Sequence, residues 1–82
     1  MGLDTVELVI AFEKEFDFVI NDDDAAILYT PADVADYVVK HSKHKYKPSV
    51  LLKIINITSA QLEIPAEEIS PGSLFVQDLG AD

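Results

Sequence analysis

The chain has 82 residues, 49% of them hydrophobic, and a formal net charge of −9. This length predicts one small domain, and the apolar content is enough for a packed core. The chain has no cysteine, which excludes a disulfide framework and a thiolate zinc site. No apolar run approaches the ~20 residues that span a bilayer, and Met1 leads into an acidic amphipathic segment rather than a signal peptide. The acidity argues against nucleic acid and membrane surfaces as partners.

Residues 3–16 have apolar side chains at helical spacing with acidic side chains between them, which predicts the first helix. The apolar run at residues 18–20 is too short for a helix and is expected to plug the core. Either Asn21 or Asp22 is expected to cap a helix here, and the aspartates that follow suit the positive end of that helix. A short second helix is therefore expected to reach about residue 28.

Thr30, Pro31 and Asp33 give the clearest local signal in the chain. The threonine caps a helix, the proline takes its first position, and the aspartate closes a capping box. They predict a third helix that ends near residue 39. Residues 40–48 are polar and basic, without an apolar stripe, and are predicted to connect two ends of a bundle.

Pro48 and Ser49 begin the last long predicted helix, which ends near Leu62. It is expected to be the most buried helix, with Leu52 and Ile57 widening its apolar stripe. A single turn is expected at residues 65–68, followed by an irregular segment. Three longer helices and one short helix predict an all-α, small four-helix bundle within a single domain, residues 1–82.

Two motifs carry a resemblance to a known family. Residues 78–82 are DLGAD and residues 3–9 are LDTVELV. Written in that order around a serine, they resemble the sequence at the modified serine of acyl carrier proteins. Residues 1–39 resemble the second half of that family and residues 49–82 its first half, which contains LEIPAEEI and SLFVQDLGAD. The resemblance implies a circularly permuted acyl carrier protein of engineered origin, in which residues 40–48 connect the former termini.

The resemblance also implies what this chain lacks. Acyl carrier proteins are not enzymes; they carry acyl chains on a 4′-phosphopantetheine arm in fatty acid or polyketide biosynthesis. The arm is attached through a serine between the two motifs, where Met1 and Gly2 stand here, flanked by Asp82 and Leu3. Because Gly2 has no hydroxyl, this chain is expected to take no arm and to hold no cofactor.

Partners and an acyl pocket follow from the same resemblance. The partners would be basic faces of fatty acid synthase enzymes and of the phosphopantetheinyl transferase, in the cytoplasm or in a plastid or other organelle stroma. The implied partner-recognition residues are Asp4, Val6, Glu7, Glu13, Glu15, Asp78 and Leu79. The residues implied to shelter an acyl chain, or else to form ordinary core, are Val9, Phe12, Phe16, Ile54, Ile57, Leu62 and Phe75. The chain is expected to be a monomer or a domain-swapped dimer.

Two other hypotheses stay open. A natural acidic interaction module with the carrier shape, which never carries an acyl chain, would also lack the serine. A small metal-binding protein would use His41 and His44, with Asp36 about a turn before them; a solvated basic tail accounts for the same histidines. Helix capping accounts for the three aspartates at residues 22–24, which lack the glycine and glutamate of an EF-hand loop.

Overall fold

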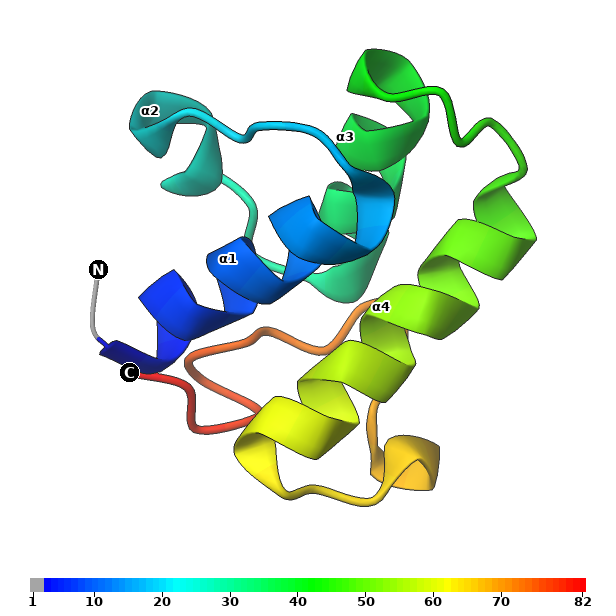
Figure 1. The fold of residues 1–82 in the computed structure, drawn as a ribbon. Coiled ribbons are helices and arrows are strands. Elements are labelled where there is room, and N and C mark those ends of the chain that lie inside the picture. Colours follow the sequence, from blue (N-terminus) through cyan, green and yellow to red (C-terminus); the bar gives the residue numbers. More distant parts are fainter. Residues whose placement is uncertain (1–2) are drawn as a thin grey trace.

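The computed structural model describes residues 3–82, which form helices and connecting segments without a strand (Figure 1). The helices are α1 (Leu3–Phe16), α2 (Asp22–Ala25), α3 (Pro31–His41) and α4 (Lys47–Leu62), followed by a 3-10 turn, η1 (Ala66–Glu68). The predicted all-α bundle of three longer helices and one short helix is confirmed. The bounds predicted for the first helix are those of α1.

α4 holds the bundle together, because it packs against both α3 and α1. Its Ile54 and Thr58 side chains are completely buried, and the Thr58 hydroxyl donates to the Ile54 carbonyl oxygen at 2.8 Å. The prediction for Leu52 is wrong, since that side chain is 60% exposed. Leu52 lies two positions from both Val50 and Ile54, and side chains two positions apart on a helix do not face the same way.

The chain turns sharply after α1. Asp17 has a φ of 52°, a left-handed conformation that aspartate tolerates better than most residues. The Ile20 N–H then donates to the Glu13 carboxylate at 2.8 Å, and the Ile20 side chain enters the core. Val19 is 80% exposed, so only part of the predicted apolar plug is buried, because successive residues in extended backbone point to opposite sides.

α2 begins where the sequence indicated. The Asn21 side chain accepts a hydrogen bond from the Asp24 N–H at 2.8 Å and so caps the helix. The Asp24 carboxylate in turn accepts a hydrogen bond from the Tyr37 hydroxyl at 2.6 Å, which ties α2 to α3. The helix ends at Ala25 rather than near residue 28, because a single turn without a long apolar stripe has little to propagate it.

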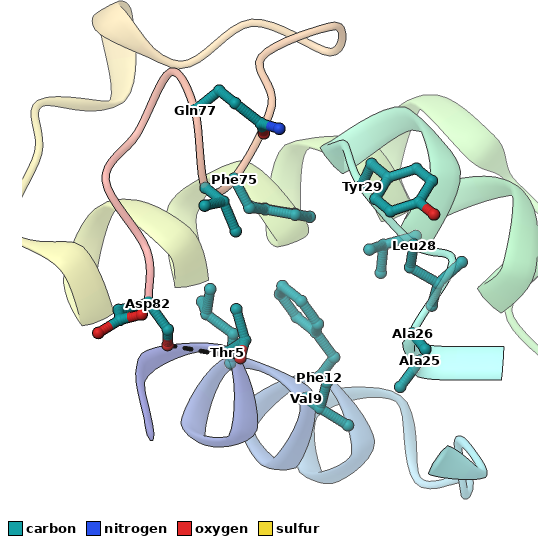
Figure 2. A pocket seen from close by; sticks show the side chains of 13 residues that line it. Thr5, Val9, Phe12, Ala25, Ala26, Leu28, Tyr29, Phe75, Gln77 and Asp82 are labelled. Carbon is teal, nitrogen blue, oxygen red and sulfur yellow. Dashed lines mark hydrogen bonds between the residues drawn. The ribbon is translucent and has the colours of Figure 1, made fainter. Parts of the chain in front are cut away.

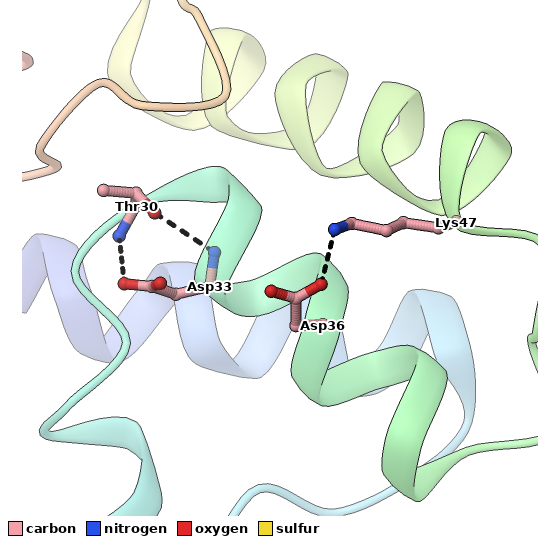
Figure 3. Close-up of polar contacts among 4 residues, drawn as sticks. All are labelled: Thr30, Asp33, Asp36 and Lys47. Carbon is pink, nitrogen blue, oxygen red and sulfur yellow. Dashed lines mark hydrogen bonds and ion pairs between the residues drawn. The ribbon is translucent and has the colours of Figure 1, made fainter.

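The predicted capping box of α3 is confirmed (Figure 3). The Thr30 hydroxyl accepts from the Asp33 N–H at 3.1 Å, and the Asp33 carboxylate accepts from the Thr30 N–H at 3.2 Å. α3 continues two residues beyond the predicted end, so the loop to α4 spans residues 42–46, within the expected connector. Lys47 forms an ion pair with Asp36 across this loop at 2.6 Å.

Candidate functional site

An apolar cavity of about 220 Å³ lies between α1, the region from α2 into α3, and the C-terminal segment (Figure 2). Each of these three regions provides part of its wall. The lining residues are Thr5, Leu8, Val9 and Phe12 from α1; Ala25, Ala26, Leu28, Tyr29 and Val34 from the α2–α3 region; and Phe75, Val76, Gln77 and Asp82 from the C-terminal segment.

Main-chain hydrogen bonds hold the C-terminal segment against the rest of the cavity. The Phe75 N–H donates to the Tyr29 carbonyl oxygen at 2.9 Å, and the Thr5 N–H donates to the main-chain oxygen of Asp82 at 3.1 Å. Between these two ties the segment folds back on itself through Gly80, whose φ is 73°, a conformation that glycine adopts without steric cost. One wall of the cavity is thus fixed at both ends.

The cavity lining combines large aromatic side chains with small ones. The Phe12 and Phe75 rings, 2% and 5% exposed, have centroids 6.4 Å apart with planes tilted by 41°. Ala25 and Ala26 lie across the cavity from Phe12, at the end of α2 (Figure 2). A methyl group on this side leaves room that a larger apolar side chain would fill, since protein interiors otherwise pack closely.

Polar groups lie on the exposed side of the cavity. The Gln77 and Asp82 side chains are exposed, and Thr5 is half-buried. Among the described residues that line the cavity, none is lysine, arginine or histidine. The exposed part of the lining also includes Ala26, Tyr29 and Val76, and the Asp82 carboxylate points away from the cavity while its main-chain oxygen faces Thr5 (Figure 2).

The structure separates the predicted acyl-pocket residues into two groups. Val9, Phe12 and Phe75 line the cavity. Phe16 and Ile54 are completely buried in the core outside it, and Ile57 and Leu62 pack against that core from α4.

Several lining residues escaped the sequence analysis, most clearly the pair Ala25 and Ala26. The buried Ala25 is a usable signal, because it places a small side chain where a bundle normally packs a large one, whereas Ala26 is exposed. Leu28, Tyr29 and Val34 give no comparable signal. Their apolar character is the same as that of ordinary core residues.

The predicted partner-recognition residues lie at two places. On α1, Val6, Glu7 and Glu15 are exposed, Asp4 is half-buried, and the half-buried Glu13 has a carboxylate bound to a main-chain N–H of the following loop.

In the C-terminal segment, the Asp78 carboxylate accepts from the Leu74 N–H at 2.9 Å. The half-buried Leu79 packs against the core. Gly2, the predicted position of the missing serine, lies outside the described residues, but both of its flanking motifs are described.

The histidines considered as metal ligands have aromatic neighbours. The His41 ring stacks on Tyr37 with centroids 4.2 Å apart, and the His44 ring meets Phe16 edge-on at 5.4 Å. Within residues 3–82, no three histidine, aspartate or glutamate side chains gather in a way that could hold a metal ion. In the same part of the chain, no helix is long and apolar enough to cross a membrane.

Comparison with known proteins gives partial-length matches to one family. The chain is 56% identical over 42 residues to the acyl carrier protein of Bdellovibrio bacteriovorus, covering 51% of this chain and 54% of that protein. It is 46% identical over 44 residues to the acyl carrier protein of Karelsulcia muelleri, covering 54% and 53%. About half of this chain is thus similar to acyl carrier proteins.

The chain spans about half the length of the curated relatives it matches. No protein-family model matches it, and no solved structure does. The all-helical bundle agrees with the small helical fold of acyl carrier proteins.

Proposed function

We propose that this chain is an acyl carrier protein in circularly permuted order, a carrier rather than an enzyme, that keeps the bundle and the cavity but cannot take the 4′-phosphopantetheine arm. In the family, the DLGAD motif precedes LDTVELV; here it follows, at residues 78–82 against 3–9. The observation that carries the proposal is the hydrogen bond from the Thr5 N–H to the main-chain oxygen of Asp82, 3.1 Å long. It brings the two motifs side by side in space.

The partial matches also support swapped blocks. The first match is 51% of this chain and 54% of its relative, so the two chains are nearly equal in length, yet only half of each is paired. An alignment that preserves chain order pairs one block and leaves the other out. Permutation accounts for both the near-equal lengths and the half coverage.

The exposed part of the acidic stripe on α1 supports the proposed partners, the basic faces of fatty acid synthase enzymes. Val6 and Glu7 face solvent near the junction of the two motifs. Glu13 and Asp78 already bind main-chain N–H groups. We therefore assign the docking role first to the exposed Val6, Glu7 and Glu15, with the half-buried Asp4 beside them, and expect it to weaken as salt screens the charges.

The test is to restore the family order. A reordered gene would place residues 48–82 first, then a serine, then residues 3–41. After incubation with coenzyme A and a promiscuous phosphopantetheinyl transferase, mass spectrometry should show one arm on the reordered chain and none on the present chain. A reordered chain with alanine in place of the serine is the matched control. A folded, serine-containing chain that stays unmodified beside a modified carrier standard would contradict the proposal.

The missing serine favours one alternative, a natural acidic interaction module that never carries an acyl chain. It would use the same α1 surface but would have no reason to present a serine to the transferase. The reordered chain distinguishes the two, because only a former carrier regains modification. Light scattering on the present chain separately distinguishes the monomer from a domain-swapped dimer.

A further inference from the structure

We propose that the loop between α3 and α4, residues 42–46, is a processing site for an endopeptidase that cuts after lysine, and that the two products stay bound as a folded two-chain bundle. The inference goes beyond the proposed function, because it depends on this loop and on the contacts between the two products, not on chain order or a prosthetic arm. Two sets of observations carry it: the exposure of the loop, and the contacts that join the products elsewhere.

The loop offers two exposed lysines outside the helices. These are Lys43 and Lys45, whereas the other four lysines of the chain lie within α1, α3 and α4. The backbone is extended at both ends of the loop, with φ and ψ of −119° and 178° at Ser42 and of −90° and 96° at Tyr46. Exposed loops are preferred sites of cleavage, because a helix must first unfold locally. The loop lysines are therefore expected to be cut first.

Of the two bonds, the one after Lys45 is the more accessible. The bond after Lys43 is held by its neighbour, since the His44 N–H donates to the Ser42 hydroxyl at 3.1 Å and the His44 ring meets the buried Phe16 ring edge-on. After Lys45 comes Tyr46, whose side chain is 72% exposed. A cut after Lys45 also leaves His44 and Phe16 on the same product, so their contact is kept.

Cleavage adds one water molecule across the Lys45–Tyr46 peptide bond. The Lys45 carbonyl carbon gains the water oxygen and becomes a carboxylate, while the Tyr46 nitrogen keeps the electrons of the broken bond, takes up protons and becomes an ammonium group. The products are residues 1–45 and 46–82. The new ammonium lies at the positive end of α4, which disfavours it slightly, but both new charges are at the surface and are solvated by water.

Main-chain hydrogen bonds join the two products at places far from the cut. Three of them span the bundle, with lengths of 2.9–3.1 Å. They run from the Thr5 N–H to the Asp82 oxygen, from the Phe75 N–H to the Tyr29 oxygen, and from the Ala32 N–H to the Pro71 oxygen. None of them depends on the peptide bond that is cut.

The hydrophobic core is also shared between the products. α4, in the second product, packs against α1 and α3 in the first, and the Phe75 ring of the second contacts the Phe12 ring of the first. The buried core side chains from the second product are Val50, Ile54, Phe75 and Ala81, and the other buried members of the cluster belong to the first. Neither product can bury its apolar side chains alone, so separation exposes them to water.

The affinity between the products follows from the stability of the linked chain. A short link holds its two parts at an effective concentration of about 1 mM, and small domains fold with an equilibrium constant of at least about 10³. The ratio of these two values gives a dissociation constant of about 1 µM or lower for the two products. The two-chain bundle should therefore stay assembled well above that concentration and unfold on dilution below it.

The experiment treats the full chain with a small amount of trypsin, which cuts after lysine, in the absence of urea. Mass spectrometry should place the first cut after Lys45. Size-exclusion chromatography with light scattering should then give one species with the mass of the intact chain plus one water, and its circular dichroism should match that of the intact chain. The urea midpoint should rise with protein concentration for the cut form and stay constant for the intact chain, because only the cut form dissociates.

A first cut after Lys43 would overturn the assignment of the bond. A first cut within a helix, or products that separate and lose their helical signal at a concentration about twentyfold above the expected dissociation constant, would overturn the proposal as a whole. Neither coenzyme A nor a transferase is used, so these outcomes leave the proposed carrier function untouched.

Matched variants test the two steps separately. Lys45→Gln should slow the first cut at least tenfold, whereas Lys53→Gln, within α4, should change its rate less than twofold. In the cut form, Phe75→Ala should weaken association at least tenfold, with Phe75→Leu as the milder change if the alanine variant does not fold. Val76→Ala, at an exposed neighbour, should weaken it less than threefold. Equal cutting rates in K45Q and K53Q, or equal association in the Phe75 and Val76 variants, would contradict the corresponding step.

Discussion

Besides the packing of α4 against α1 and α3, the two halves of the bundle are joined at the connector and at the junction of the two motifs, and these two places are held together differently. At the connector, residues 42–46, the peptide chain joins α3 to α4, and the ion pair beside it has side chains 50% and 63% exposed. At the junction of α1 with the C-terminal segment, residues 77 positions apart form hydrogen bonds. Buried side chains lie next to this junction, with Ala81 2% and Phe75 5% exposed.

The comparison shows that the place where the peptide chain joins the two halves need not be the place whose contacts stabilise the fold most. Exposed ion pairs contribute little to stability, typically ~0–1 kcal/mol, whereas burying a large apolar side chain contributes ~1.5–3 kcal/mol. The junction is therefore expected to matter more than the connector. Chain order can change at modest cost, because the entropy of closing a loop grows slowly with its length.

The largest expected effect comes from the junction. Phe75→Ala removes a ring that contacts Phe12 and should lower the free energy of unfolding by about 3–5 kcal/mol, a large share of the ~5–15 kcal/mol typical of small domains. Urea unfolding followed by circular dichroism measures it. Val76→Ala, at a neighbouring side chain that is 54% exposed, is the control and should cost under about 1 kcal/mol. Similar losses of unfolding free energy in both variants would show that buried contacts do not stabilise the junction.

An intermediate effect on stability is expected from the hydrogen bond between α2 and α3. The hydrogen bond to Asp24, followed by burial and by the charge of that carboxylate, raises the pKa of Tyr37 from 10.0 to about 12. Because the pKa is raised in the folded state, the stabilisation is complete below pH 10 and is lost as the pH rises to about 12. Tyr37→Phe should cost about 1.5 kcal/mol at pH 8.

The same measurement at higher pH distinguishes this bond from simple packing. The difference between Tyr37→Phe and the unmodified chain, measured by urea unfolding, should shrink steadily above pH 10. Every other group is common to both proteins, so its effect on stability cancels in the difference. Tyr46→Phe, at a side chain that is 72% exposed, serves as the reference. A difference that stays constant to pH 12 would mean that the hydroxyl bond contributes nothing.

The smallest effect is expected at the connector. A double-mutant cycle with Asp36→Asn and Lys47→Met should give a coupling free energy below about 1 kcal/mol. Added salt should reduce that coupling further, because both side chains are exposed to solvent. A coupling free energy above about 2 kcal/mol would mean that the connector contributes more to stability than this comparison with the junction allows.

Local sequence signals predicted the helices well. The bounds of α1, the Asn21 cap and the Thr30–Asp33 capping box all depend on residues three or four positions apart, and the sequence displays such spacings directly. The exposure of Leu52 was missed, because a helix as apolar as α4 shows no clear polar face. Which of its sides the two neighbouring helices cover is settled by packing.

The sequence alone determined where the helices begin, to within a residue or two, where α1 and α4 end, the order of the two motifs and the glycine at position 2. The tertiary structure decided that Asp82 binds Thr5 and that Val9, Phe12 and Phe75, but not Phe16 or Ile54, line a cavity. The physical reason is how far apart along the chain the interacting residues lie. Caps and helix faces depend on neighbours along the chain, whereas a cavity is the space left between side chains from three distant segments.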